Sequence, residues 1–319
     1  MQNNIFVKVH NVSRYYGPLL AVNNVNFDVK QGEVLGFLGP NGAGKSTTMM
    51  ILTGNLAPSS GQIIINGIDL LEQPRQAKAH IGFLPEQPPV YRDLTVDEYL
   101  RFCAKIHRIS RDKVNSRVDT AKQRCGLGDV GQRLIGNLSK GYQQRVGIAQ
   151  AIVHSPAVVI LDEPTVGLDP IQIREIRGLI RELRGDHSVI LSTHILPEIQ
   201  TTCDRVQIIN RGELVLSDTV EGLEQRMQES RLTVTLNHPP SLPELEAIAG
   251  VTTVEAVTDN QFAIHYEPGH SPAEAIVETA VQKGWRLSQL TPEKRSLEQI
   301  FVDITTSEPT GDNSGEQAA

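Results

Sequence analysis

The chain has 319 residues, of which 39% are hydrophobic and 21% charged, a composition typical of a soluble globular protein with one large domain or two ordinary ones. Its 37 acidic and 30 basic residues give a net charge of −7, which argues against a general nucleic-acid-binding surface. No apolar run approaches the length of a membrane span, the first residues lack the apolar core of a secretion signal, and the three cysteines fit no zinc or redox spacing.

Strands and helices alternate over residues 5–216. We expect an α/β domain here, with a mainly helical insertion at about residues 92–155 and a further helix over 171–184. The run at 157–161 is continuously apolar, as in a strand buried on both faces of a parallel sheet. The other expected strands are 5–9, 26–29, 34–38, 62–66, 188–192, 205–210 and 212–216.

A capping box opens the helical insertion. Thr95 and Glu98 stand three residues apart, so each side chain can satisfy a backbone donor of the other. Apolar residues then follow at helical spacing, which predicts an amphipathic helix. These residues are Val96, Tyr99, Leu100, Cys103 and Ile106.

The pattern changes after about residue 230. The order β-α-β-β-α-β predicts a small α+β, ferredoxin-like domain over residues 231–306. A polar tail at 307–319 is expected to be disordered. The elements expected in this part are strands at 232–236, 252–257, 261–266 and 285–290, and helices at 242–249, 272–283 and 296–304.

The most informative segment follows the expected strand 34–38. Residues 39–47 read Gly-Pro-Asn-Gly-Ala-Gly-Lys-Ser-Thr, the phosphate-binding loop of nucleoside triphosphatases. Its glycines let backbone N–H groups approach a phosphate chain, and the helix that follows presents its positive dipole end to the anion. Lys45 supplies a cation for the β- and γ-phosphates, and the Ser46 hydroxyl can ligate magnesium. The loop alone predicts nucleotide binding without identifying the nucleotide.

Two adjacent acids close the buried strand. Asp162 and Glu163 point in opposite directions if the strand geometry continues to its end. This arrangement allows Asp162 to face a metal ion and Glu163 to face the attacking water. Hydrolysis at a magnesium–phosphate centre needs a group for each task.

A third segment, Leu138-Ser139-Lys140-Gly141-Tyr142, stands just before a helical stretch at 143–153. A serine followed by glycine at the start of a helix suits a phosphate, although alone it is ordinary helix capping. Its position upstream of the acid pair favours the functional interpretation.

With these motifs in order, the chain resembles the ATP-binding subunit of an ABC transporter. The resemblance implies a P-loop NTPase (RecA-like) core over residues 1–226, with an antiparallel β subdomain beside the helical insertion. The region after residue 230 is similar to the accessory domain of some exporter-type subunits. The matching segments are the Walker A loop at 39–47, the signature motif at 138–142, Walker B at 158–165, the D-loop at 167–169, His194 as the switch histidine, and Tyr16 as the aromatic residue that stacks on adenine.

The resemblance implies ATP and Mg²⁺ as cofactors and a role for each matched residue. Glu163 activates water, and His194 stabilises the γ-phosphate and the transition state. Magnesium is held by Ser46, Asp162 and either Glu86 or Gln87. The ATP-binding residues are Tyr16, Gly39, Pro40, Asn41, Gly42, Ala43, Gly44, Lys45, Ser46, Thr47, Ser139 and Gly141.

The resemblance also implies partners. Ser139 and Gly141 touch the ATP held by a second ATP-binding subunit, and a homodimer is favoured because the site of this chain is complete. The dimer works under a separate integral membrane permease, on the cytoplasmic face of the cell membrane, and binds no nucleic acid. The transported substrate is not encoded in these motifs.

The sequence departs from the family pattern at two places. Lys140 and Tyr142 stand where the signature motif has Gly and Gln, and we expect function to survive because Ser139 and Gly141 remain. The glutamine position of the Q-loop falls on Glu86, with Gln87 beside it, so either side chain can approach magnesium. A glutamate at this place resembles exporters more than importers.

Two other functions are compatible with an ABC-type ATPase. One acts on nucleic acid or ribosomes; such proteins usually carry two cassettes, long coiled coils or zinc clusters, and the sequence shows none of these. The other is a degenerate cassette that binds ATP as a regulatory module. This regulatory function is disfavoured because the sequence has the whole catalytic set, Lys45, Asp162, Glu163 and His194.

Overall fold

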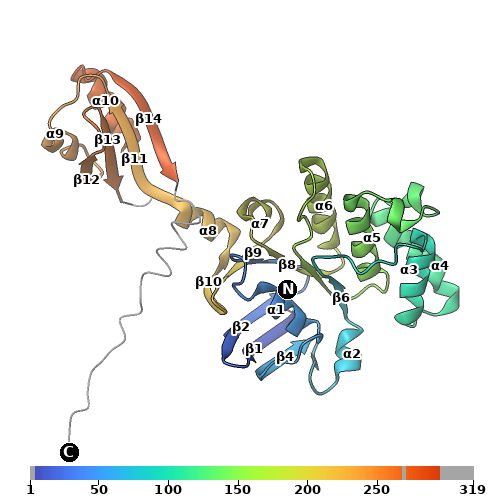
Figure 1. The fold of residues 1–319 in the computed structure, drawn as a ribbon. Helices are drawn as coiled ribbons and strands as arrows, with labels where there is room; N and C mark the ends of the chain where they lie inside the picture. Colours follow the sequence, from blue (N-terminus) through green and yellow to red (C-terminus); the bar gives the residue numbers. More distant parts are fainter. Residues whose placement is uncertain (1–3, 268–270, 295–319) are drawn as a thin grey trace, which may run out of the picture. The chain divides into compact units, whose positions relative to one another are not determined.

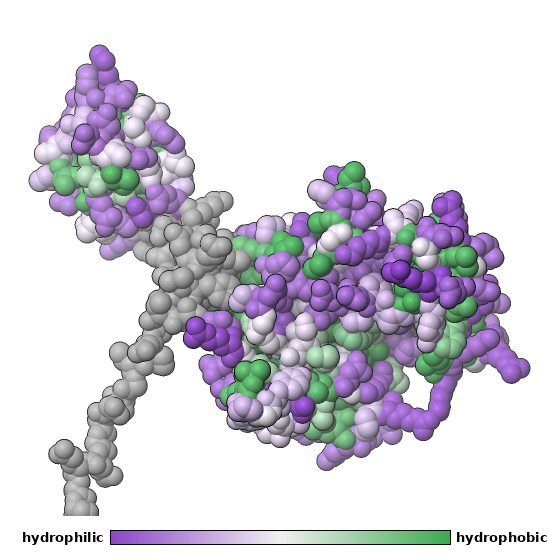
Figure 2. Space-filling view, viewed as in Figure 1, coloured by the Kyte–Doolittle hydropathy of each residue, from purple (hydrophilic) through white to green (hydrophobic). Residues whose placement is uncertain are grey.

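The computed structural model describes residues 4–267 and 271–294, and the chain divides into two compact units, residues 1–220 and 221–319 (Figure 1). Each unit has its own core of buried apolar side chains. On the face drawn in Figure 2, hydrophilic residues cover much of the described surface, as the composition of a globular protein predicts.

A six-stranded sheet forms the centre of the first unit. Its strands are β3 (Val34–Leu38), β6 (Ile81–Leu84), β7 (Val158–Asp162), β8 (Ser188–Thr193), β9 (Arg205–Asn210) and β10 (Glu213–Thr219). The order is β10-β9-β3-β8-β7-β6, and all neighbours are parallel except β10 and β9. Every residue of β3, β7 and β8 is buried, which confirms the strand predicted from the apolar run. β6, a four-residue strand that contains Gly82, was not among the predicted strands.

The carboxyl ends of the parallel strands lie along one edge of this sheet, and the predicted motifs follow them. The phosphate loop joins β3 to α1 (Lys45–Leu52), the acid pair ends β7, and His194 follows β8. The chain continues after the acid pair into α6 (Pro170–Leu183), and after His194 into α7 (Leu196–Thr202). Segments far apart in the sequence therefore meet at this edge.

The predicted antiparallel β subdomain is a four-stranded sheet of order β2-β1-β4-β5. It comprises β1 (Ile5–Tyr16), β2 (Leu19–Lys30), β4 (Ser60–Ile65) and β5 (Ile68–Asp69), and a short helix, α2 (Pro74–Lys78), follows. The hairpin of β1 and β2 is longer than predicted, because β1 continues past Val9 through shifts of pairing register that break the alternation. The rings of Phe27 and Phe37 have centroids 5.2 Å apart, so both sheets share one core.

The helical insertion is confirmed and contains α3 (Val96–Ile106), α4 (Arg111–Arg124) and α5 (Lys140–Ile152). The predicted capping box is present: the Thr95 N–H donates to Glu98 Oε2 at 2.8 Å, and the Glu98 N–H donates to Thr95 Oγ1 at 3.3 Å. The predicted apolar residues of α3 are buried except Ile106, which is 60% exposed because it lies at the end of the helix.

The second unit confirms the predicted ferredoxin-like arrangement. Its sheet has the order β12-β13-β11-β14, with antiparallel neighbours throughout, so β13 lies between the parallel strands β11 and β12. The predicted helix at 242–249 ends at Glu246, before Gly250 turns the chain with a φ of 89°. The predicted helix 296–304 and the tail 307–319 lie outside the described residues. The elements are α8 (Val220–Met227), β11 (Gln228–Leu236), α9 (Leu242–Glu246), β12 (Val251–Ala256), β13 (Gln261–Tyr266), α10 (Ala273–Gln282) and β14 (Leu287–Lys294).

Candidate nucleotide-binding and catalytic site

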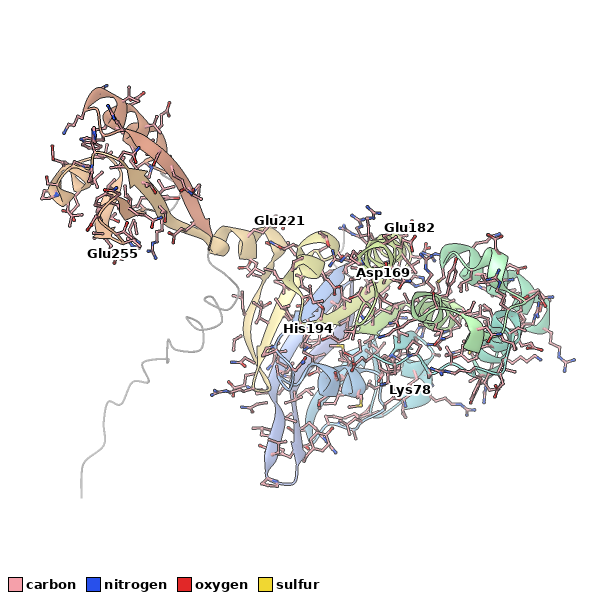
Figure 3. The ribbon with its side chains drawn as sticks, turned by 45° about the horizontal axis from the view of Figure 1, so that its top comes forward. Lys78, Asp169, Glu182, His194, Glu221 and Glu255 are labelled. Atoms are coloured by element: carbon pink, nitrogen blue, oxygen red, sulfur yellow. The ribbon has the colours of Figure 1, made fainter. Side chains whose placement is uncertain are left out.

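A cavity of about 580 Å³ lies at the carboxyl edge of the central sheet. Its walls come from the hairpin of β1 and β2, the phosphate loop, and the segments that follow β6, β7, β8 and β9. Figure 3 labels His194, which stands directly after β8. The predicted site residues that line the cavity are Tyr16, Asn41, Gly42, Gly44, Lys45, Ser46, Thr47, Glu86, Glu163 and His194.

The phosphate loop turns through backbone positions that only glycine adopts readily. Gly42 and Gly44 have φ angles of 79° and 106°. A Cβ atom at Gly39 would lie 2.4 Å from the carbonyl oxygen of Ile209, so no side chain fits there. Lys45 closes the loop, because its Nζ atom donates to the Gly39 carbonyl oxygen at 2.8 Å. The loop residues Gly39, Pro40 and Ala43 shape this turn without lining the cavity.

The carboxylate of Glu163 lies between two nitrogen groups. Its Oε1 atom is 3.4 Å from Lys45 Nζ, and its Oε2 atom is 3.0 Å from His194 Nδ1. The side chains of Glu163 and Lys45 are 8% and 5% exposed, whereas that of His194 is 43% exposed. The carboxylate is therefore held at the inner wall of the cavity, with the imidazole at its opening.

The backbone of Glu163 has a φ of 48°, an uncommon value for a residue other than glycine. The Glu163 N–H donates to the carbonyl oxygen of Ser192 at 3.1 Å and to its hydroxyl oxygen at 3.3 Å. Strained backbone of this kind persists where its surroundings fix it, and it concentrates at functional sites. The turn aims Glu163 at the cavity while Asp162 stays in the strand.

Asp162 meets the hydroxyl of Ser46. The Ser46 Oγ atom donates to Asp162 Oδ1 at 3.4 Å, and the hydroxyl of Ser192 donates to the same oxygen. Mg²⁺ prefers oxygen ligands and takes one or two protein oxygens together with substrate phosphates and water. A hydroxyl and a carboxylate beside a phosphate loop fit that requirement, so the residues present suit the predicted magnesium ion.

The two candidates for the Q-loop residue lie in different surroundings. Glu86 lines the nucleotide cavity together with Lys45 and Glu163. Gln87 lines a neighbouring cavity of about 540 Å³, which Glu86 also borders. Of the two candidates, Glu86 is therefore the one that lines the cavity of the phosphate loop.

Ser139 and Gly141 lie at the start of α5, and neither lines the cavity of its own chain. Ser139 caps the helix, because its Oγ atom accepts from the Tyr142 N–H at 3.4 Å. Gly141 packs against α6, where an added Cβ atom would lie 2.6 Å from the Gln172 side chain. The signature segment is thus well formed but separate from the nucleotide cavity.

Two further residues at this edge were not predicted from the sequence. Arg211 lines the cavity, and Ser192 donates to Asp162. Parallel pairing sets Asp162 opposite Ser192, and this pairing is readable only once β7 and β8 are known to be neighbours. The Ser-Thr-His run at 192–194 is the one local signal that could have indicated Ser192.

A strand, a glycine-rich phosphate loop and a helix, with an acid pair on a nearby strand, define a P-loop nucleoside triphosphatase. Comparison with known proteins narrows this class. The chain belongs to the ATP-binding proteins of ABC transporters, and it is an ATPase. The sequence pattern of the family described as ABC transporter matches residues 22–166.

Similar curated proteins match along nearly the whole chain. The bacitracin transport ATP-binding protein BcrA of Bacillus licheniformis is 33% identical over 300 residues, which cover 93% of this chain and 96% of that protein. The linearmycin resistance ATP-binding protein LnrL of Bacillus subtilis (strain 168) is 30% identical over 305 residues, which cover 94% of this chain and 98% of that protein.

Similar solved structures cover about two thirds of the chain. An ATP-binding subunit of an ABC transporter matches with a TM-score of 0.63 and 31% identity, over 69% of this chain and 92% of that one. The ATP-binding cassette MJ0796, in a dimeric post-hydrolysis state bound to ADP and Pi, matches with a TM-score of 0.61 and 26% identity, over 67% of this chain and 98% of that one.

A helix that crosses a lipid bilayer needs about 20 predominantly apolar residues. Within residues 4–267 and 271–294, none combines the length and the apolar character needed to cross a membrane.

Proposed function

We propose that this chain is the ATP-hydrolysing subunit of an exporter whose permease is a separate membrane protein. The proposal of ATP hydrolysis at this site rests on one observation: Lys45, Glu163 and His194 lie together in one cavity. Export is supported by relatives that are named for linearmycin resistance and for probable multidrug transport.

In the proposed reaction, each of these three side chains has one task. Lys45 and the N–H groups of the loop bind the β- and γ-phosphates of ATP. Glu163 orients the attacking water and accepts its proton, because its carboxylate is fixed beside the cation that holds the γ-phosphate. His194 stabilises the γ-phosphate as charge develops on it.

The remaining cavity residues hold the rest of the nucleotide. Tyr16 stacks on adenine at the end of β1. Ser46 and Asp162 would hold magnesium, with Glu86 as the Q-loop residue. When bound, the ion neutralises charge on the phosphates.

We also propose that two copies of the chain form the working unit. Ser139 and Gly141 lie outside the cavity of their own chain and would reach the γ-phosphate of ATP bound to the partner. A homodimer suffices because each chain carries the whole catalytic set. Bound ATP would then favour the closed dimer, because its γ-phosphate would bind more tightly to the closed dimer than to the open one.

The proposed dimer also gives a role to each part of the chain. Residues 1–226 would form the ATP-binding domain, with the helical subdomain at about 92–155, and residues 231–306 would form an accessory domain. The dimer would sit on the cytoplasmic face of the membrane, beneath the permease.

Purification of the tagged full-length chain from membranes of its own cells tests this assembly. We expect a hydrophobic permease to co-purify and to raise the rate of ATP hydrolysis. A chain recovered entirely without a permease would contradict the proposal. Stimulation of hydrolysis by RNA or DNA, lost at high salt, would support the nucleic-acid alternative instead.

A further inference from the structure

A buried carboxylate stands behind the Glu163–His194 pair. Glu198 lies in α7, which packs on α6 and β8 (Figure 1), and its side chain is 1% exposed. A carboxylate this deeply buried requires hydrogen-bond donors or a cation around it. Glu198 belongs to none of the sequence motifs described above.

Two threonine hydroxyls donate to Glu198, one to each carboxylate oxygen. The Thr165 hydroxyl donates to Oε1, and the Thr193 hydroxyl donates to Oε2 at 2.7 Å. Thr165 follows Glu163 by two residues, and Thr193 directly precedes His194. The Glu198 carboxylate therefore joins the loop after β7 to the loop after β8.

A third element holds the same carboxylate. The Nη2 atom of Arg177, on α6, is 3.5 Å from Glu198 Oε1. The Nε atom of Arg177 is buried and has no hydrogen-bond partner among the described residues. The ion pair between Nη2 and Glu198 is the charged contact that the structure gives this guanidinium within its described residues. The Thr193 hydroxyl also accepts from the Ile195 N–H at 3.1 Å, which fixes the backbone on both sides of His194.

We propose that Glu198 is a positioning residue of the ATPase site. Its carboxylate fixes the two loops relative to each other and so maintains the 3.0 Å contact between His194 and Glu163. Glu198 does not line the nucleotide cavity, so it acts through these residues and not on ATP. The inference rests on the roles that the proposed function gives to Glu163 and His194.

The expected signature is a loss of rate without a matching loss of affinity. A displacement of catalytic groups by about 1 Å can cost on the order of a hundredfold in rate. The phosphate loop and Lys45 bind ATP independently of Glu198, so the affinity for ATP should change little. A residue that only stabilised the fold would instead affect rate, affinity and melting temperature together.

Full-length variants separate these outcomes when kcat, KM, ATP affinity and melting temperature are measured for each. We expect Glu198→Ala, Thr165→Val and Thr193→Val to lower kcat by about tenfold to a hundredfold and to change ATP affinity less than about threefold. Thr165→Ser and Thr193→Ser retain the hydroxyl and should keep nearly the wild-type kcat. Thr201→Ala is the matched control, because the Thr201 hydroxyl donates to the backbone carbonyl oxygens of Pro197 and Glu198 within α7 and not to the Glu198 carboxylate.

Wild-type protein and Glu163→Gln, assayed in parallel, distinguish failure of this inference from failure of the proposed function. If Glu163→Gln loses turnover while Glu198→Ala and both valine variants keep it, the positioning role is overturned and the proposed function stands. If Glu163→Gln stays active, the proposed function itself fails. If Glu198→Ala does not fold, the threonine variants test the positioning role in its place. An equal loss of kcat in the valine and the serine variants would overturn the inference.

Discussion

The Nδ1 atom of His194 lies 3.0 Å from the Oε2 atom of Glu163, although the residues are 31 positions apart in the chain. The register of the central sheet produces this contact, because parallel pairing sets Asp162 opposite Ser192 and so brings the ends of β7 and β8 together. The tight turn at Glu163 then directs its carboxylate toward the cavity. The arrangement of the proposed catalytic groups therefore depends on the order of the strands as much as on the motifs themselves.

Tyr16 should determine much of the affinity for the adenine base. Tyr16 lines the cavity and is 41% exposed as a residue, and the Arg14 guanidinium carbon lies 4.9 Å from its ring centroid. Stacking of a base on an aromatic ring contributes about 1–3 kcal/mol, so Tyr16→Ala should weaken ATP binding by about tenfold, as measured by calorimetry. Tyr16→Phe should bind nearly normally. Tyr15→Ala, an exposed neighbour outside the cavity lining, is the control, and an equal loss there would contradict the stacking role.

The capping box at the start of α3 should contribute to stability. Thr95→Ala removes the hydroxyl that accepts from the Glu98 N–H and should lower the free energy of unfolding by about 1 kcal/mol, measured by urea denaturation. Thr120→Ala is the comparison, because this exposed hydroxyl bonds only to the Ser116 carbonyl one turn earlier in α4 among the bonds described. Equal effects of both substitutions would show that the cap has no special contribution.

A pair of stacked histidines should make stability depend on pH. The rings of His107 and His154 have centroids 3.6 Å apart and planes 5° from parallel. Burial is the main cause that lowers the pKa of His154 from 6.5 to about 3, and burial also lowers the pKa of His107. Because the unfolded chain binds these protons more readily, the stability is fully present above pH 6.5 and is lost as the pH falls toward the folded-state pKa.

Urea denaturation at pH 7.5 and at pH 5.5 tests this dependence. A buried neutral histidine such as His154 should account for about 1 kcal/mol of the stability lost over this interval. The variant His154→Gln should lose less stability on acidification than the wild type. His10→Gln, at an exposed position, should respond to pH as the wild type does. The account is wrong if both variants and the wild type respond alike.

The sequence predicted those parts of the molecule whose signals are local. The phosphate loop at 39–47 has fixed residue types at fixed spacing, and the run at 157–161 has the continuous apolar character of a strand buried on both faces. The capping box at Thr95 was predicted for the same reason, since its two partners are three residues apart. In each case the physical cause of the structure lies within a few residues.

The contacts that complete the site were not predictable in this way. The hydrogen bond from Ser192 to Asp162 and the bonds from Thr165 and Thr193 to Glu198 depend on which strands and helices are neighbours. Glu198 is the third residue of the short helix α7, and nothing in the neighbouring sequence indicates that its side chain is buried. The length of β1 was likewise hidden, because register shifts interrupt its alternation.

The central claim is that Glu163 is the catalytic base of a site that a second copy of the chain completes. Its most direct test is the molar mass of full-length Glu163→Gln, measured by light scattering in Mg²⁺ with ATP or with ADP, alongside the rate of ATP hydrolysis. The account predicts a loss of turnover of about a hundredfold or more, and a dimer that forms with ATP and not with ADP. Glu182→Gln, an exposed acid on α6 that is labelled in Figure 3, should retain wild-type turnover. Unchanged turnover in Glu163→Gln, or a variant that stays monomeric with ATP bound, would contradict the claim.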